Sequence, residues 1–306
     1  LLSPFLPFSP FFSFSPFQLF SRLVSVPSFA SLMVLGRTST KSEPPPVQQE
    51  ESAPEVGFRD GVIDVRGGKN KKFKSNWVVV KGGALQYFDT DKFPSGKKPS
   101  ETIGLLGVQL RQATKKECKA KTDFVFAIRY TPTGKKKAEE LFFAAKSGEE
   151  ANGWMRAIGD SIALAAPTLF AIPLHVAIAK SGAPLPAVVL GCMNGLADRF
   201  ATDGLFREFP PPEAVMDART NFDAGALDVS TADPHVILAL LAMFLRELPE
   251  PVSTFGMFPF WLKMAEKDVG PRLEELPEAC GSLPPANKTT LQVLLRFLND
   301  ATEQSS

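Results

Sequence analysis

The chain has 306 residues, of which 44% are hydrophobic and 22% are charged. This composition is typical of globular proteins, and the length allows about two domains. The 3 cysteines lie far apart and the 2 histidines are isolated, which excludes a disulfide framework and the common short-spaced zinc motifs. Neither a Gly-x-x-x-x-Gly-Lys-[Ser/Thr] motif nor a Gly-x-Ser-x-Gly motif occurs, so the sequence offers no carrier for hydrolase chemistry of its own.

The net charge of +1 conceals a strong difference between segments of the chain. Residues 56–146 carry 20 basic and 9 acidic side chains, whereas residues 147–306 carry 11 basic and 20 acidic side chains. These opposite balances predict that the first segment faces an anionic surface and that the second meets a different partner.

The first 55 residues are predicted to lie outside the folded domains, as a disordered segment and linker. Residues 1–37 are rich in Phe, Ser and Pro, and their prolines interrupt them too often for a membrane-spanning helix. Two interpretations of residues 1–32 stay open: sequence upstream of the true start, favoured because the first methionine is Met33, or an organelle-targeting signal. Residues 38–55 are polar and proline-rich, which is typical of a linker.

Short apolar segments follow, separated by breaks rich in Gly, Lys and Pro. They are residues 61–66, 77–81, 84–89, 101–106, 108–113, 124–130 and 140–145. β-branched and aromatic residues dominate them, and the breaks have hairpin length, as expected of β-strands. The spacing then becomes helical over residues 147–166, with Ser147 and Glu150 as a capping box and Trp154 among the apolar positions. The pattern predicts a small β-barrel or sandwich with a helix that closes one open end.

Residues 58–164 resemble a pleckstrin homology (PH) domain. The matching pieces are GVIDV, FKSNWVVV, LQYFDT and EEANGWMRAI, and Trp154 takes the place of the family's helical tryptophan. The resemblance implies a seven-stranded β-barrel or sandwich with a C-terminal capping helix, and we expect the domain to span residues 56–165. Trp154 is the largest side chain available to fill the end of such a barrel, so we assign it to the core.

In PH domains the loop between the first two strands holds phosphoinositide headgroups, and in this chain the corresponding loop, RGGKNKKFKS, is strongly basic. The resemblance therefore implies acidic phospholipids or phosphoinositides as ligands, and each lysine adds about 1 kcal/mol of attraction near an anionic membrane. Asn76 stands where tightly binding members have an arginine, so we expect charge-driven binding with little headgroup selectivity. The alternative is a solvated run of charges without a ligand. The candidate lipid-binding residues are Arg66, Lys69, Lys71, Lys72 and Lys74.

After residue 167 the apolar spacing is helical almost throughout. Prolines precede several segments, as they do at helix starts, and Gly225 and Pro249 follow the ends of two of them. His235, alone at the start of one segment, is interpreted as a packing or capping residue. The predicted helices are residues 184–201, 211–225, 233–248 and 285–301. The sequence thus predicts an all-α bundle.

The order of these segments resembles a RhoGAP domain, the activator of Rho-family GTPases. Four family motifs occur in order: LFAIPL (169–174), DGLFRE (203–208), FLRELPEPV (244–252) and LPPANKTTLQVLLRFLN (283–299). The resemblance implies an all-α RhoGAP helical bundle over residues 168–306 and a Rho- or Rac-type small GTPase as partner, with no nucleic acid. It also implies no metal or cofactor in this chain, because GTP and Mg²⁺ belong to the partner.

Arg207, in DGLFRE, matches the family's arginine finger. A guanidinium supplied by a partner protein stabilises charge that develops on the transferred phosphoryl group, worth about 10³ to 10⁵ in rate. The resemblance makes Arg207 the catalytic residue, Arg246 a brace for the finger loop and the partner's surface, and Asn287 a supporting residue that also fits as a helix cap. The predicted protein activates a partner enzyme without being an enzyme itself, and it is cytoplasmic and peripheral at the membrane.

Departures from the family pattern leave alternatives open. Glu208, Phe209 and Pro210 stand where the family has a small residue and a glycine. Ala242 replaces a lysine, and the sequence ends before the family's closing helices, so we expect a gene fragment with an incomplete RhoGAP domain. The alternatives are a scaffold that binds the GTPase without activating it, and a module that only binds membranes.

Overall fold

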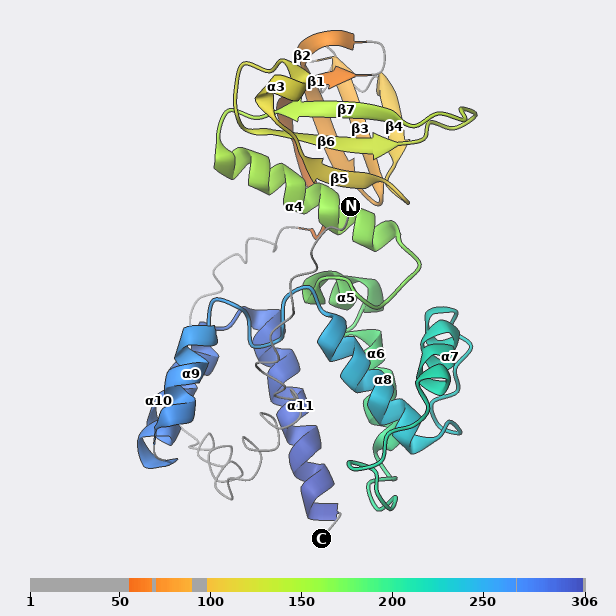
Figure 1. Ribbon diagram of the computed structural model, residues 1–306, viewed down its shortest axis with the longest axis vertical. Coiled ribbons are helices and arrows are strands. Elements are labelled where there is room, and N and C mark those ends of the chain that lie inside the picture. The colour runs from red at the N-terminus through yellow and green to blue at the C-terminus, as the bar shows by residue number, and fades with distance from the viewer. Residues whose placement is uncertain (1–54, 68–69, 90–97, 268, 305–306) are drawn as a thin grey trace, which may run out of the picture. The chain divides into compact units, whose positions relative to one another are not determined.

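The computed structural model describes residues 55–67, 70–89, 98–267 and 269–304. The predicted N-terminal segment, residues 1–55, lies outside these ranges except for Glu55. Strands come first in the described chain, followed by a long series of helices (Figure 1). Within the described ranges, no helix combines the length and the apolar character needed to cross a membrane.

Seven strands of the described chain form one antiparallel sheet. They are β1 (Arg59–Gly67), β2 (Asn70–Lys81), β3 (Ala84–Asp89), β4 (Glu101–Gly104), β5 (Gln109–Gln112), β6 (Val125–Tyr130) and β7 (Glu139–Ala144). Their order across the sheet is β4-β3-β2-β1-β7-β6-β5, so β1 pairs with both β2 and β7. Each of the seven predicted strand segments overlaps one of them, and the predicted seven-stranded fold is confirmed.

Alternate residues of the strands face a common core, as the two-residue period of a strand requires. In β2 the buried positions are Asn76, Val78 and Val80. Val78 and Val80 belong to one cluster of buried apolar residues that includes side chains from the other strands. This core accounts for the β-branched and aromatic composition of the strand segments.

Helix α4 (Gly148–Ala165) packs against β2, β5 and β6 and adds Trp154 to the same core. The indole of Trp154 is 2% exposed, so its assignment to the core is confirmed. The guanidinium of Arg59 lies over this ring, 4.9 Å from its centroid. Gly153 makes room for Arg59, because a Cβ at this position would collide with the guanidinium.

The N-terminus of α4 departs from the predicted capping box in one detail. The hydroxyl of Ser147 accepts a hydrogen bond from the backbone N–H of Glu150 at 3.1 Å, as predicted. The carboxylate of Glu150, however, accepts from the backbone N–H of Lys146 at 2.7 Å. The glutamate side chain is long enough to reach an amide one residue before the N-cap, so the reciprocal bond is displaced by one position.

A short helix that was not predicted, α3 (Lys115–Cys118), lies between β5 and β6. Thr114 and Glu117 form a complete capping box at its start, with the hydroxyl and the carboxylate each accepting from the other residue's backbone N–H. A four-residue helix carries no repeat of apolar positions, so periodicity could not reveal it. The Thr-x-x-Glu pattern was the available signal.

A carboxylate joins two phenols on separate strands of the sheet. The hydroxyl of Tyr87, on β3, donates to Oε2 of Glu101, and that of Tyr130, on β6, donates to Oε1 at 3.0 Å. Burial, together with these hydrogen bonds, raises the pKa of both phenols above its ordinary value. Because β3 and β6 are not neighbours in the sheet, Glu101 links strands that no backbone ladder joins.

Tyr130→Phe should lower the free energy of unfolding by about 1 to 2 kcal/mol at pH 7, since it removes one hydrogen bond to a charged acceptor. A phenol whose pKa is raised by folding stabilises the protein fully below its unfolded pKa of about 10, and this stabilisation is lost as the pH rises further. The advantage of the original protein should therefore shrink above pH 10. Urea denaturation at pH 7 and near pH 11 checks both statements, and equal stability of the two proteins at pH 7 would contradict them.

The remaining described elements are helical. They are α5 (Leu174–Ser181), α6 (Ala187–Leu196), α7 (Pro212–Asp223), α8 (Pro234–Glu247), α9 (Phe258–Glu266), α10 (Val269–Ser282) and α11 (Pro285–Gln304). Four of these, α6, α7, α8 and α11, overlap the predicted helices, and the predicted helical region is confirmed. Helices α5, α9 and α10 were not predicted: α5 has only eight residues, aromatic residues crowd α9, and Pro277 lies inside α10.

Helix α8 packs against α6 and α7 through an apolar face. Its buried residues are Ile237, Leu240, Leu241 and Phe244, at the three- and four-residue spacing of one helix face. The ring of Phe244 meets that of Phe170 edge-on, with centroids 6.0 Å apart. This packing fixes the position of α8 among its neighbours.

Candidate arginine-finger site

The loop between α6 and α7 carries two arginines, and the structure gives them different roles. Arg199 is committed to the fold: its Nε and both terminal nitrogens donate to the carbonyl oxygens of Gly195, Ala232 and Val229, each at 2.6 Å. These bonds fasten the segment before α8 to the end of α6. The guanidinium of Arg199 is thereby used inside the chain, which leaves Arg207 as the candidate for an external role.

The segment around Arg207 is a closed turn. The backbone N–H groups of Arg207 and Glu208 both donate to the carbonyl of Gly204, at 2.7 and 2.8 Å. Gly204 has a φ of 68°, in the left-handed region that favours glycine. Leu205 is buried and holds the turn to the helices, whereas Arg207 is exposed. Within the described residues the guanidinium of Arg207 makes no hydrogen bond or ion pair, so it is available to a partner.

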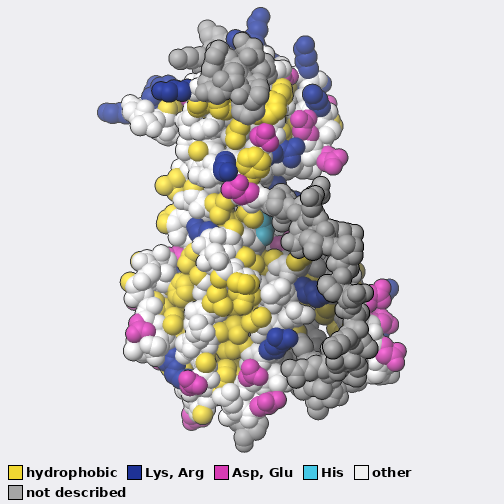
Figure 2. Space-filling model, turned by 180° about the vertical axis from the view of Figure 1, so that it is seen from behind, with side chains coloured by type: hydrophobic (Ala, Val, Ile, Leu, Met, Phe, Trp, Pro, Cys, Tyr) yellow, Lys and Arg dark blue, Asp and Glu magenta, His cyan; other side chains and the backbone are white. Residues whose placement is uncertain are grey.

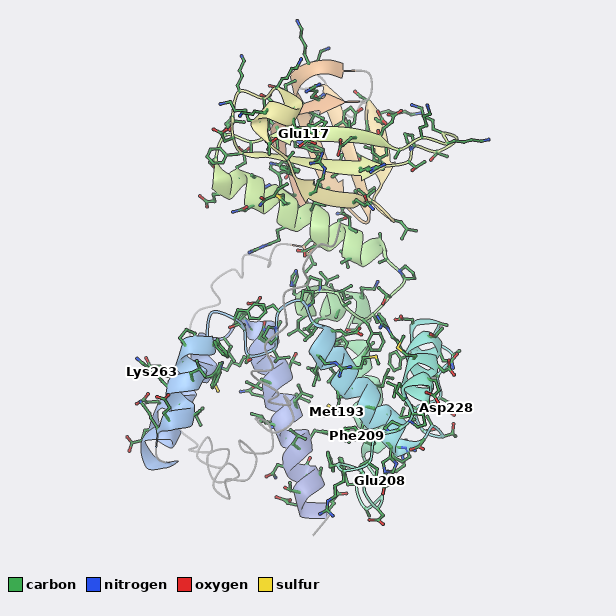
Figure 3. The ribbon with its side chains drawn as sticks, viewed as in Figure 1. Glu117, Met193, Glu208, Phe209, Asp228 and Lys263 are labelled. Atoms are coloured by element: carbon green, nitrogen blue, oxygen red, sulfur yellow. The ribbon has the colours of Figure 1, made fainter. Side chains whose placement is uncertain are left out.

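The acidic neighbour of Arg207 does not neutralise it. The carboxylate of Glu208 is folded over Gly204, where a Cβ would lie 2.7 Å from Oε1 of the glutamate. In the described chain no ion pair joins Glu208 to Arg207. Phe209, the next residue, is 84% exposed (Figure 3). The departure of this loop from the family pattern thus presents a cation and an aromatic ring to solvent.

His235 ties this loop to the start of α8. Its Nδ1 lies 3.2 Å from Oδ1 of Asp233, the N-cap of α8, and its Nε2 lies 3.2 Å from the carbonyl oxygen of Asp203. The backbone N–H of His235 also donates to the Asp233 carboxylate at 2.8 Å, and these bonds hold the pKa of that carboxyl below its usual value. The sequence interpretation of His235 as a packing or capping residue missed the tie, because its partner lies 32 residues away.

His235→Ala should loosen the finger loop. Loss of the ring removes the bond to the Asp203 carbonyl, and a hydrogen bond of about 1 kcal/mol corresponds to about fivefold faster local opening. Hydrogen exchange measured by mass spectrometry on the peptide that contains residues 203–208 checks this. His175→Ala, which changes the other histidine of the chain, is the control. Equal exchange in the two variants would show that His235 does not hold the loop.

Arg246 lies in the last turn of α8 and is exposed. The described residues contain no hydrogen bond between Arg246 and the finger loop, so its bracing role stays a prediction. The neighbouring residue Glu247 accepts from Arg219 of α7 at 3.0 Å, and the Arg219 guanidinium lies 5.0 Å from the ring centroid of Phe170. The end of α8 is therefore fixed by Glu247, and Arg246 is left facing outward.

Asn287 lies in the first turn of α11. Its Nδ2 donates to the carbonyl of Val252 at 3.0 Å, which ties this turn to the end of the FLRELPEPV motif. This supports the part of the prediction that concerns positioning within the chain. A contact of Asn287 with a partner stays a prediction.

Among the described residues, no group of three or more His, Cys, Asp or Glu side chains is arranged to hold a metal ion.

The candidate lipid-binding residues differ in their surroundings. Lys69 lies outside the described residues. Lys71, Lys72 and Lys74 belong to β2 and not to a loop as predicted, because β2 already begins at Asn70. Lys72 and Lys74 are exposed, and at a spacing of two they share one face of the strand. Basic side chains project from the sheet-bearing part of the chain in Figure 2.

Arg66 is the most constrained member of this set. Its Nη1 donates to the carbonyl of Cys118 at the end of α3, and its guanidinium lies 5.8 Å from the ring centroid of Phe142. Asn76, which stands where tightly binding PH domains have an arginine, is 2% exposed and donates to the Phe88 carbonyl at 3.2 Å. An inward-facing residue offers no group to a lipid, so the exposed lysines carry the lipid hypothesis.

Two families match the chain. Residues 58–163 match the PH domain model, and residues 186–306 match the RhoGAP domain model. Mouse Rho GTPase-activating protein 22 is 30% identical over 253 residues, which are 77% of this chain and 35% of that protein. Human Bargin is 30% identical over 142 residues, which are 45% of this chain and 21% of that protein. The chain therefore spans only about a fifth to a third of the length of these curated relatives. The crystal structure of human Rho GTPase activating protein 15 is 25% identical, with a TM-score of 0.41 over 44% of this chain and 67% of that one.

Proposed function

Because the chain contains a PH domain followed by a RhoGAP domain, we propose that it accelerates GTP hydrolysis on a Rho- or Rac-type small GTPase. The observation that carries this proposal is the contrast between the two arginines of one loop. Arg199 gives its nitrogens to three internal carbonyls, whereas Arg207 is exposed on a turn that Leu205 anchors. A free guanidinium on a supported loop is what an arginine finger needs.

Arg207 would act on charge that exists mainly in the transition state. As the phosphoryl group transfers to water, negative charge spreads over its oxygens, and the guanidinium offers a planar cation with several N–H donors at fixed angles. A cation that is already oriented needs little reorganisation during the reaction, so its stabilisation is expressed in the rate. The nucleotide and Mg²⁺ would belong to the GTPase, and this chain would supply the cation.

The PH domain would bring the activator to acidic phospholipids or phosphoinositides. Lys72 and Lys74 are exposed on one face of β2, and Lys69 and Lys71 lie close to them in the sequence. Their ammonium groups would attract an anionic surface without defining one headgroup. The protein would then be cytoplasmic and peripheral at the membrane.

Single-turnover GTP hydrolysis by a panel of Rho- and Rac-type GTPases, with and without the protein, tests the proposal. We expect acceleration for at least one GTPase. Binding of a GTP-loaded GTPase without acceleration would favour the scaffold, and neither binding nor acceleration would leave only the membrane-binding module.

A further inference from the structure

Phe209 is 84% exposed, which makes it the most exposed of the large apolar side chains in the described residues. It lies two positions after Arg207. A single exposed apolar side chain is common on protein surfaces and is not evidence of a contact by itself. Two further features distinguish Phe209: the way the chain holds it, and its closeness in sequence to the arginine that must approach the nucleotide.

The backbone on both sides of Phe209 is fixed. On one side, the turn is closed by the bonds from Arg207 and Glu208 to the Gly204 carbonyl, and the Glu208 side chain is folded over Gly204. On the other side, Pro210 restricts Phe209 to extended conformations and Pro212 begins α7. A ring held on such a segment loses little backbone freedom when it is buried in a complex.

We propose that Phe209 is an apolar contact for the partner GTPase, and that it sets the affinity and the choice of partner while Arg207 acts on the reaction. This inference rests on the proposed function. Two residues of chain span at most about 7 Å, so a guanidinium that reaches the nucleotide phosphates places the Phe209 ring against the surface beside them. The GTPase that fits has an apolar patch at that place. Aromatic residues are the frequent anchors of such interfaces, with a large apolar area and few rotatable bonds.

The two residues should separate in kinetics. An apolar contact forms equally in the ground state and in the transition state, so its loss raises KM and leaves kcat unchanged. With the full chain, Phe209→Ala should raise KM for the GTP-loaded GTPase about tenfold, since partial burial of a phenylalanine contributes about that much. Phe209→Leu should restore most of the affinity. Phe255→Ala is the matched control, because Phe255 is 65% exposed in the segment between α8 and α9.

A binding measurement that needs no catalysis separates failure of this inference from failure of the proposed function. In the Arg207→Ala protein, adding Phe209→Ala should raise Kd for the GTP-loaded GTPase about tenfold, as measured by calorimetry. If the original protein accelerates hydrolysis but Phe209→Ala changes neither KM nor Kd, or lowers only kcat, the inference is wrong and the function stands. If the original protein does not accelerate hydrolysis but Phe209→Ala weakens binding, the inference stands for a scaffold. Absence of binding to every GTPase of the panel overturns both.

Discussion

Replacing Arg207 with alanine is expected to abolish the stimulation of GTP hydrolysis, with a loss of about 10³ to 10⁵ in the stimulated rate. Binding to the GTP-loaded GTPase should stay nearly unchanged, because the guanidinium acts on charge that is small before the transition state. Arg207→Lys should fail almost as completely, since an ammonium group cannot reproduce the planar two-pronged contact. Single-turnover hydrolysis combined with a binding titration measures both quantities.

Other arginines of the chain provide the comparison. Arg156→Ala, at an exposed position of α4, should leave rate and binding unchanged. Arg246→Ala should weaken both, as expected of a residue that positions the loop and contacts the partner. Arg199→Ala should lower stability, because three carbonyls lose their donor. If Arg207→Ala keeps the full stimulated rate in folded protein, Arg207 is a surface charge and the scaffold becomes the better interpretation.

Replacing the four lysines of the first hairpin with alanine is expected to remove nearly all binding to acidic liposomes. Each lysine near an anionic surface contributes about 1 kcal/mol, so the set of four corresponds to a decrease of about 10³ in affinity. Binding of the original protein should also fall steeply between low and physiological salt, where charges are screened within about 8 Å. The variant carries changes at Lys69, Lys71, Lys72 and Lys74, and liposome sedimentation measures the affinity.

A pair of double variants locates the effect. Lys72→Ala with Lys74→Ala should weaken binding more than Lys136→Ala with Lys137→Ala, although both remove two exposed charges from the same domain. Equal losses would mean that the net charge, and not this hairpin, attracts the membrane. Unchanged sedimentation of the four-lysine variant would exclude the hairpin as the docking site.

The sheet and most helices could be predicted because their signals are local. Runs of β-branched residues marked the strands, and an apolar face with three- and four-residue spacing marked α8. Helix α3 escaped because four residues are too few to show a period. That the side chain of Asn76 faces the core was also not predicted, since a shift of one residue in strand register moves a side chain to the other face.

In the candidate site, too, the local signals could be predicted from the sequence and the contacts between distant residues could not. The motif order pointed to Arg207, but the sequence could not show that Arg199, eight positions earlier, is used inside the chain. The carbonyls that its terminal nitrogens reach lie 33 and 30 residues away. The tie from His235 to the Asp203 carbonyl has the same character. Contacts between a side chain and a distant backbone carbonyl leave no mark in composition or spacing, so they become visible only when the fold brings the segments together.

The packing of Arg59 over Trp154 constrains how this domain can change in evolution. A glycine inside a helix costs about 1 kcal/mol relative to alanine, so selection would ordinarily replace Gly153. An alanine at this position would require the guanidinium of Arg59, which occupies the space of the added Cβ, to move away from the Trp154 ring. The two positions, far apart in sequence, are therefore coupled: a lineage that shortens residue 59 frees residue 153 to become alanine, whereas one that keeps the arginine gains the better helix former only by giving up the packing of Arg59 on Trp154.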